Sequence, residues 1–199
     1  MPTIAILGTF DSKGPEHGFI AEKIRARGLD VLLVNAGSLA APGITPDIAS
    51  DEVAAAGADD WKEVLARQDR GECVTLMAHG AARVIARLAD EGRIQGIISL
   101  GGGGGTAICT AAMRALPIGF PKVMVSTLAS GNTAPYVGTK DIVMIPAIAD
   151  VAGINRLTRV IFENAAGAIC GMVGAAEERR HAPANDRPLI VASMFGNTT

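Results

Sequence analysis

The chain has 199 residues, enough for one domain with a sizeable hydrophobic core. Its 18 basic and 20 acidic residues give a formal net charge of -2, so charge provides no basis for binding nucleic acid or an anionic membrane surface. Hydrophobic residues make up 49% of the chain and aromatic residues only 4%. This composition suits a parallel sheet covered by helices and argues against a protein that stacks single-stranded bases.

The N-terminus and the cysteines favour a cytoplasmic protein. No basic stretch precedes the first apolar run, which is typical of a strand rather than a signal peptide. No apolar segment approaches the roughly 20 residues that a bilayer-spanning helix needs. Cys73, Cys109 and Cys170 are scattered and form no CxxC pair, which argues against a disulfide framework or a zinc site. We expect buried thiols in a reducing compartment.

Short apolar runs alternate with longer segments of helical period, which is the pattern of repeated βαβ units. The alternation predicts an α/β fold with an open, mostly parallel sheet and helices on both faces. We expect strands at residues 3–7, 31–34, 95–100, 122–126, 142–145 and 188–194. We expect helices from Pro15 to Gly28, within 36–58, and at 61–67, 74–91, 107–116 and 157–172.

The chain divides into a main domain at residues 1–176, a charged linker at 177–187 that contains Pro183, and a last segment at 188–199. Residues 190–198 loosely echo residues 4–12, the first strand and the turn after it. The last segment is therefore either the first strand of a truncated second domain or a strand that completes the same sheet.

The strongest motif lies between a predicted strand and a predicted helix and consists of Gly101, Gly102, Gly103, Gly104, Gly105 and Thr106. Glycines place no Cβ between their N–H groups and a ligand. We expect Thr106 to cap the helix, whose first N–H groups are unpaired and lie at the positive end of its dipole. The pattern predicts an anion site, most often for phosphate. The alternative is a turn that only allows tight packing of strand against helix.

Two familiar phosphate motifs do not fit this turn. A Walker A loop has a lysine before its Ser or Thr, whereas Gly105 precedes Thr106 here. A dinucleotide fingerprint needs an acidic residue about 20 positions later. The next strand instead ends in Ser126 and Thr127, which disfavours NAD.

A second motif leaves the first strand and contains Gly8, Thr9, Asp11, Ser12 and Lys13. Asp11 could bind a magnesium ion or its water, and Lys13 could form an ion pair with a phosphate group. Alternatively, Asp11 or Ser12 only caps the first helix while Lys13 is solvated. Asn35 ends the second strand, where nucleotide-binding folds often place a side chain that contacts ribose.

A third segment follows the strand at 122–126 and contains Ser126, Thr127, Ser130, Gly131 and Asn132. Ligands in open parallel sheets bind beyond the carboxyl ends of the strands, so all three motifs should border one crevice. A solvated surface loop is the alternative for this segment.

Other polar residues carry weaker signals. Asp150 and Asn155 bracket the start of the last long helix, where capping is the simpler role. His17, His79 and His181 lie far apart in the sequence, and Ser126 is not part of a G-x-S-x-G motif. These observations argue against a hydrolytic triad.

Several segments together resemble one family: residues 8–14 (GTFDSKG), 100–106 (LGGGGGT), 117–131 (PIGFPKVMVSTLASG), 136–141 (YVGTKD) and 150–155 (DVAGIN). The family is largely uncharacterised and is typified by the ATP-binding inhibitory domain of the tomato mosaic virus resistance protein. The resemblance extends to about Val173. It implies a Rossmann-like N-terminal domain that binds ATP, tends to form dimers and is usually followed by a second domain. It does not imply a catalysed reaction.

The leading hypothesis is therefore an ATP-binding domain. The turn at 101–106 would hold the phosphates, and Asp11, Ser12 and Lys13 would complete the site with Mg²⁺. The loop at 126–132 would form the opposite wall. Two rivals stay open: an enzyme that uses the crevice for another phosphorylated or carboxylate metabolite, and a regulatory module whose nucleotide orders a partner surface.

Overall fold

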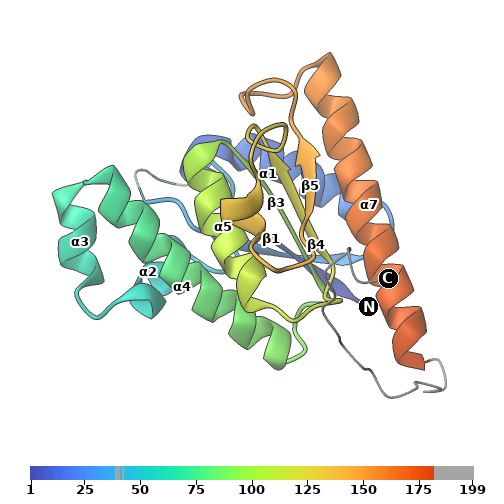
Figure 1. Cartoon of the computed structure of the whole chain (residues 1–199), viewed down its shortest axis with the longest axis horizontal. Helices are drawn as coiled ribbons and strands as arrows, with labels where there is room; N and C mark the ends of the chain where they lie inside the picture. Colours follow the sequence, from blue (N-terminus) through green and yellow to red (C-terminus); the bar gives the residue numbers. More distant parts are fainter. Residues whose placement is uncertain (39–40, 42, 182–199) are drawn as a thin grey trace, which may run out of the picture.

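A computed structural model describes residues 1–38, 41 and 43–181 of the chain. The strands are β1 (Thr3–Gly8), β2 (Asp30–Asn35), β3 (Gly96–Gly101), β4 (Lys122–Ser126) and β5 (Val143–Pro146). The helices are α1 (Phe10–Arg25), α2 (Ser50–Gly57), α3 (Trp61–Arg67), α4 (Arg70–Asp90), α5 (Gly103–Ala115), α6 (Ala134–Val137) and α7 (Arg156–His181). Figure 1 shows their arrangement.

The five strands form one sheet in the order β2-β1-β3-β4-β5, and every neighbouring pair is parallel. The predicted α/β fold with a Rossmann-like open sheet is thereby confirmed. The strand order reverses between β1 and β3, because the chain passes from β2 to the far side of β1 before it forms β3. A doubly wound sheet has its ligand crevice at such a point, outside the carboxyl ends of the strands.

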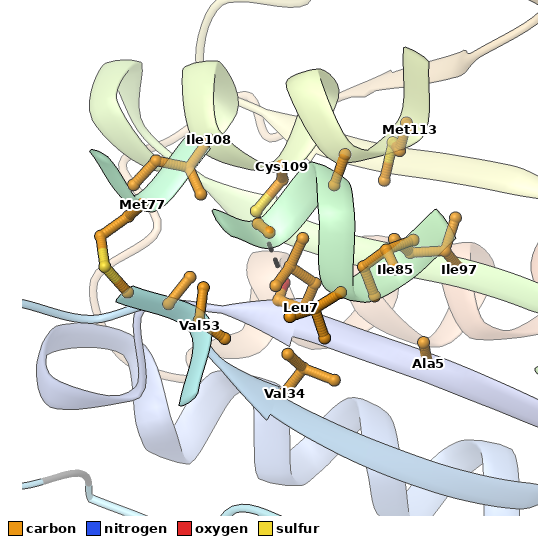
Figure 2. Close-up of a cluster of buried hydrophobic side chains, with 14 of the residues drawn as sticks. Ala5, Leu7, Val34, Val53, Met77, Ile85, Ile97, Ile108, Cys109 and Met113 are labelled. Carbon is orange, nitrogen blue, oxygen red and sulfur yellow. Dashed lines mark hydrogen bonds between the residues drawn. The ribbon is translucent and has the colours of Figure 1, made fainter. Parts of the chain in front are cut away.

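Two hydrophobic layers cover the sheet, one on each face. Alternate residues of β1 point to opposite layers, as the period of a strand requires. Ile4 and Ile6 pack in the layer that α1 and α7 cover. Ala5 and Leu7 pack in the layer that α2, α4 and α5 cover, where Figure 2 shows Leu7 close to Cys109. Aliphatic side chains dominate both layers, as the composition predicted.

Three helices begin earlier than the sequence indicated. α1 begins at Phe10 rather than Pro15 and bends at Lys13, whose backbone is non-helical (φ -132°, ψ 26°). α4 begins at Arg70 rather than Val74, and α5 begins at Gly103. Each of these earlier starts brings polar or glycine residues into a first helical turn, where unpaired N–H groups lie.

The last helix differs from expectation in its length. α7 continues to His181, so residues 177–181 of the expected linker are helical. The rest of that linker and the expected strand at 188–194 lie outside the described residues. By length and composition α7 could cross a membrane, so the expectation that no segment is long and apolar enough is wrong here. In this fold its buried stripe, which includes Phe162, Ile169 and Val173, packs on the sheet as a core helix does.

Candidate functional site

A cavity of about 390 Å³ lies at the carboxyl ends of β1 and β3, where the strand order reverses. Four segments supply most of its lining: the turn after β1, the end of β2, the start of α4 and the turn after β3. The lining residues are Thr9, Asp11, Ser12, Lys13, Ala36, Ser38, Gln68, Arg70, Cys73, Val74, Gly101, Gly102, Gly103, Gly104, Gly105 and Ile108. Two of the three predicted motifs therefore border one cavity.

The five glycines are divided between strand and helix. Gly101 ends β3, Gly102 occupies the N-cap position of α5, and Gly103, Gly104 and Gly105 form its first turn. Thr106 does not cap this helix as predicted. It is the fourth residue of α5, and its N–H donates to the carbonyl of Gly102, the N-cap residue (2.8 Å). The first N–H groups of α5 thus belong to glycines beside the cavity.

Tight packing accounts for the first glycine only. A Cβ on Gly101 would lie 3.2 Å from the Gly105 Cα, closer than ordinary contact. On Gly102, Gly104 and Gly105 it would meet its nearest neighbours at 3.6 to 3.9 Å, and on Gly103 it would meet nothing within 4 Å. Because glycine costs a helix about 1 kcal/mol per residue relative to alanine, this run is costly and the packing of the domain does not require it.

Thr106 and Ser126 lie behind the turn rather than in the cavity. Both side chains are fully buried, and their hydroxyl oxygens are 2.7 Å apart. The Ser126 hydroxyl also accepts a hydrogen bond from the Leu128 N–H (3.0 Å). These two predicted ligand residues therefore fix the turn against β4.

The turn after β1 contributes hydroxyls and a cation to the cavity. The Thr9 and Ser12 hydroxyl oxygens lie 3.0 Å apart, and Lys13 lies at the bend of α1. Gly8 does not line the cavity; it packs against the His17 ring, with which a Cβ at this position would collide. The His17 Nδ1 donates to the Lys13 carbonyl (2.6 Å), and burial lowers the pKa of His17 to about 4, so the ring is neutral and braces the bend.

Asn35 and Asp11 both lie next to Gly37, just beyond the end of β2. The Asn35 Oδ1 accepts hydrogen bonds from the N–H groups of Phe10 (3.0 Å) and Gly37 (2.9 Å), and the side chain is buried. Asn35 thus joins β2 to the start of α1 and does not line the cavity. The Asp11 carboxyl lies against Gly37, where a Cβ would come within 2.6 Å of it.

The loop after β4 lies beside the cavity rather than in its lining. Thr127 comes closest, since its N–H donates to the Gly101 carbonyl (3.3 Å). Ser130, Gly131 and Asn132 are exposed, and the Asn132 Oδ1 accepts from the Ala134 N–H (3.1 Å) at the start of α6. The expected opposite wall is instead supplied by the start of α4.

Of the two polar residues expected near the start of the last helix, Asn155 caps that helix. The Asn155 Oδ1 accepts hydrogen bonds from the N–H groups of Leu157 (2.9 Å) and Thr158 (3.0 Å) at the start of α7. Asp150 is exposed in the loop before this helix. Neither residue lines the cavity.

Sequence reasoning missed the contribution of α4, above all that of Arg70. Arg70 is the first residue of the helix, after the N-cap Asp69, whose carboxylate accepts from the Glu72 N–H (2.9 Å). A cation in the first turn opposes the helix dipole, and this unfavourable position is the signal that could have identified it. Cys73 and Val74 follow and give the cavity an apolar wall together with Ala36 and Ile108.

Residues 2–178 match the model of the N-terminal domain of the uncharacterised protein family UPF0261. The chain belongs to this family. This UPF0261 domain is 48% identical over 197 residues to a UPF0261 protein of Clostridium tetani, covering 98% of this chain and 48% of that protein. It is 33% identical over 217 residues to the ToMV susceptible protein tm-1(GCR26) of Solanum lycopersicum, covering 100% of this chain and 28% of that protein.

A third relative is the ToMV resistance protein Tm-1(GCR237) of Solanum lycopersicum, which is 41% identical over 132 residues, 65% of this chain and 18% of that protein. The family resemblance seen in the motifs is thereby confirmed. The UPF0261 domain spans about half the length of the bacterial relatives that it matches.

Proposed function

We propose that this domain binds ATP, with the phosphates on the first turn of α5. The observation that carries the proposal is the glycine run at residues 102–105, which borders the cavity although packing does not require glycine there. Missing side chains let an anion approach the unpaired N–H groups at the positive end of the helix. The resemblance to an ATP-binding family supports the same ligand.

The charges around the cavity suit a phosphorylated ligand. Lys13 and Arg70 line it, and Asp11 is the one carboxylate among its described lining residues. The apolar wall that Ala36, Val74 and Ile108 help to form suits the base of a nucleotide.

Magnesium fits this arrangement only together with the ligand. Proteins usually hold Mg²⁺ in nucleotide sites by one or two carboxylates plus substrate phosphates. In the described part of the chain no group of three or more His, Cys, Asp and Glu side chains could hold a metal ion. Asp11 would therefore be the protein ligand, with the Thr9 and Ser12 hydroxyls beside it. The bound ion would neutralise phosphate charge.

The deciding experiment is calorimetric titration with ATP, ADP, AMP and NAD in the presence of Mg²⁺. We expect micromolar-range binding of ATP, and an absence of binding by every adenine nucleotide would refute the proposal. Phosphate release over hours then separates an enzyme from a domain that only binds. If another phosphorylated metabolite binds where ATP does not, the rival enzyme hypothesis gains support instead.

Two variants connect binding to the site. Gly103→Val should reduce affinity for ATP at least about 100-fold by blocking approach to the N–H groups, yet it should fold normally, because the position is open. Gly174→Val is the matched control, since Gly174 is also helical, exposed and without neighbours within 4 Å. Lys13→Ala should weaken ATP binding without abolishing it. Unchanged ATP binding by Gly103→Val would exclude the turn.

A further inference from the structure

Two cationic side chains reach the cavity from different elements. Lys13 comes from the bend of α1, after β1, and Arg70 comes from the first turn of α4. An Arg70 guanidinium nitrogen lies 3.9 Å from the position that a Cβ on Gly104 would occupy. Arg70 therefore extends over the first turn of α5, the place that we assign to phosphate.

Arg70 differs from the neighbouring arginines in its partners. Arg67 forms an ion pair with Glu72 (2.6 Å), and Arg87 forms one with Glu52 (2.8 Å). Arg83 donates to the Ala56 carbonyl (2.7 Å). Among the ion pairs and hydrogen bonds found between described residues, none involves the Arg70 guanidinium.

The position of Arg70 is electrostatically unfavourable, and no ion pair or hydrogen bond between described residues offsets it. A positive charge at the first position of a helix is repelled by the helix dipole. The guanidinium also extends beside the first turn of α5, which has the same positive polarity. A bound anion between these groups would reverse both repulsions. This is the physical reason for treating Arg70 as a ligand-binding residue.

We propose that Arg70 binds the outer phosphates of a polyphosphate and makes the site selective for nucleoside di- and triphosphates over monophosphates. This inference rests on the proposed function of the cavity. Because Lys13 and Arg70 enter from different elements, they can contact different phosphate groups. The N–H groups of α5 and Lys13 suffice for one phosphate, and the planar guanidinium of Arg70 adds a two-pronged contact to the next.

The test compares Arg70→Ala and Arg70→Lys with Arg67→Ala as the matched control. Arg67 is nearby, is also exposed and charged, and does not line the cavity. Calorimetric titrations at fixed ionic strength use ATP, AMP and inorganic tripolyphosphate, and circular dichroism checks that each variant is folded. Arg70 is itself exposed, so its replacement should leave the fold intact.

We expect Arg70→Ala to lower affinity for ATP and for tripolyphosphate about 10- to 100-fold, while affinity for AMP changes less than about twofold. Arg70→Lys should recover part of the loss, and Arg67→Ala should match the original protein. Equal losses for ATP and AMP, or no loss for either, would overturn the inference.

The tripolyphosphate probe separates this inference from the proposed function. Tripolyphosphate binding that depends on Arg70, without binding of any adenine nucleotide, would support the role of Arg70 and refute the ATP proposal. ATP binding that does not depend on Arg70 would support the ATP proposal and refute the role of Arg70. If neither compound binds the original protein, both are refuted.

Discussion

The hydroxyl of Thr106, the fourth residue of α5, lies 2.7 Å from the Ser126 hydroxyl at the end of β4. Both residues are fully buried. The contact links the glycine turn to the strand beside it, so the position of the α5 N–H groups depends on two side chains that do not line the cavity.

Replacing Thr106 by Val should test this link. Val keeps the shape of the side chain but leaves the buried Ser126 hydroxyl without one of its partners, which typically costs about 1 to 3 kcal/mol. We expect that loss in urea unfolding and a several-fold weaker affinity for ATP. Thr75→Val is the control, because the exposed Thr75 hydroxyl donates only to the Gly71 carbonyl (2.9 Å) of its own helix. Equal stability losses in both variants would contradict the argument.

The sequence allowed the framework to be predicted because the framework depends on local patterns. The strand at 122–126 and the helix at 61–67 have the predicted bounds. The continuous burial of the apolar run in β1 and the glycine turn after β3 also follow from neighbouring residues. The convergence of the first two motifs followed from the rule that the carboxyl ends of parallel strands share one edge.

The remaining features depend on contacts between residues far apart in the chain. α1 begins at Phe10 because the side chain of Asn35, at the end of β2, accepts the Phe10 N–H. Residues 103–105 are helical although glycine disfavours helix, so tertiary context overrides propensity there. Arg70 reaches the cavity only because α4 packs beside α5. None of these contacts can be read from local periodicity.

The buried His17 should make the stability of the domain depend on pH. Burial lowers the pKa of His17 to about 4 from its ordinary 6.5. The unfolded chain therefore takes up a proton below about pH 6.5 that the folded chain refuses until about pH 4. Stability is fully present above the unfolded pKa and is lost as the pH falls between these values, by a total on the order of 3 kcal/mol.

Urea unfolding at pH 7.0, 5.5 and 4.5 measures this dependence. His17→Gln is the comparison, because Gln does not titrate. The informative quantity is the slope of the free energy of unfolding against pH, not its absolute value. We expect a steeper loss toward acid in the original protein than in the variant. His79 and His181 are exposed and stay the same in both proteins. Parallel slopes would show that His17 does not control the acid response.

Lys122 is fully buried at the start of β4 and should stabilise the segments that precede β4 and β5. Its Nζ donates to the carbonyls of Pro117 and Phe120 and to the Asp141 carboxylate, each at 2.8 Å. Burial opposes ionisation of Asp141, but the hydrogen bonds from Lys122 and from the Gly119 N–H overcome it and hold the pKa of this carboxyl below its ordinary value.

We expect Lys122→Met to destabilise the domain by about 2 to 4 kcal/mol, because it removes the Lys122 donor from two carbonyls and leaves the Asp141 carboxylate with the Gly119 N–H but no cation. The pKa of Asp141, followed by NMR, should rise toward its ordinary value. Lys140→Met is the control, since the Lys140 Nζ donates to one carbonyl only, that of Leu116 (2.8 Å), and should cost less than about 1 kcal/mol. Similar losses in the two variants would contradict the role of Lys122.

Ile148 has an unfavourable backbone conformation in the loop between β5 and α7. Its φ is 63°, a region that β-branched residues rarely adopt. The Ala149 N–H donates to the Ala147 carbonyl (2.7 Å) and closes a three-residue turn around it. The side chain is 78% exposed, so its packing contributes little in return.

Ile148→Gly should therefore stabilise the domain. Glycine adopts this conformation without a steric penalty, although its freedom in the unfolded chain offsets part of the gain, so we expect a net increase of about 0.5 to 1 kcal/mol. Ile118→Gly is the matched control: Ile118 is 75% exposed and has no positive φ, so the same substitution should lower stability. Urea unfolding of the two variants gives opposite signs if backbone strain at Ile148 is the cause. A loss in both would mean that the isoleucine is more valuable to the folded loop than its strained backbone is costly.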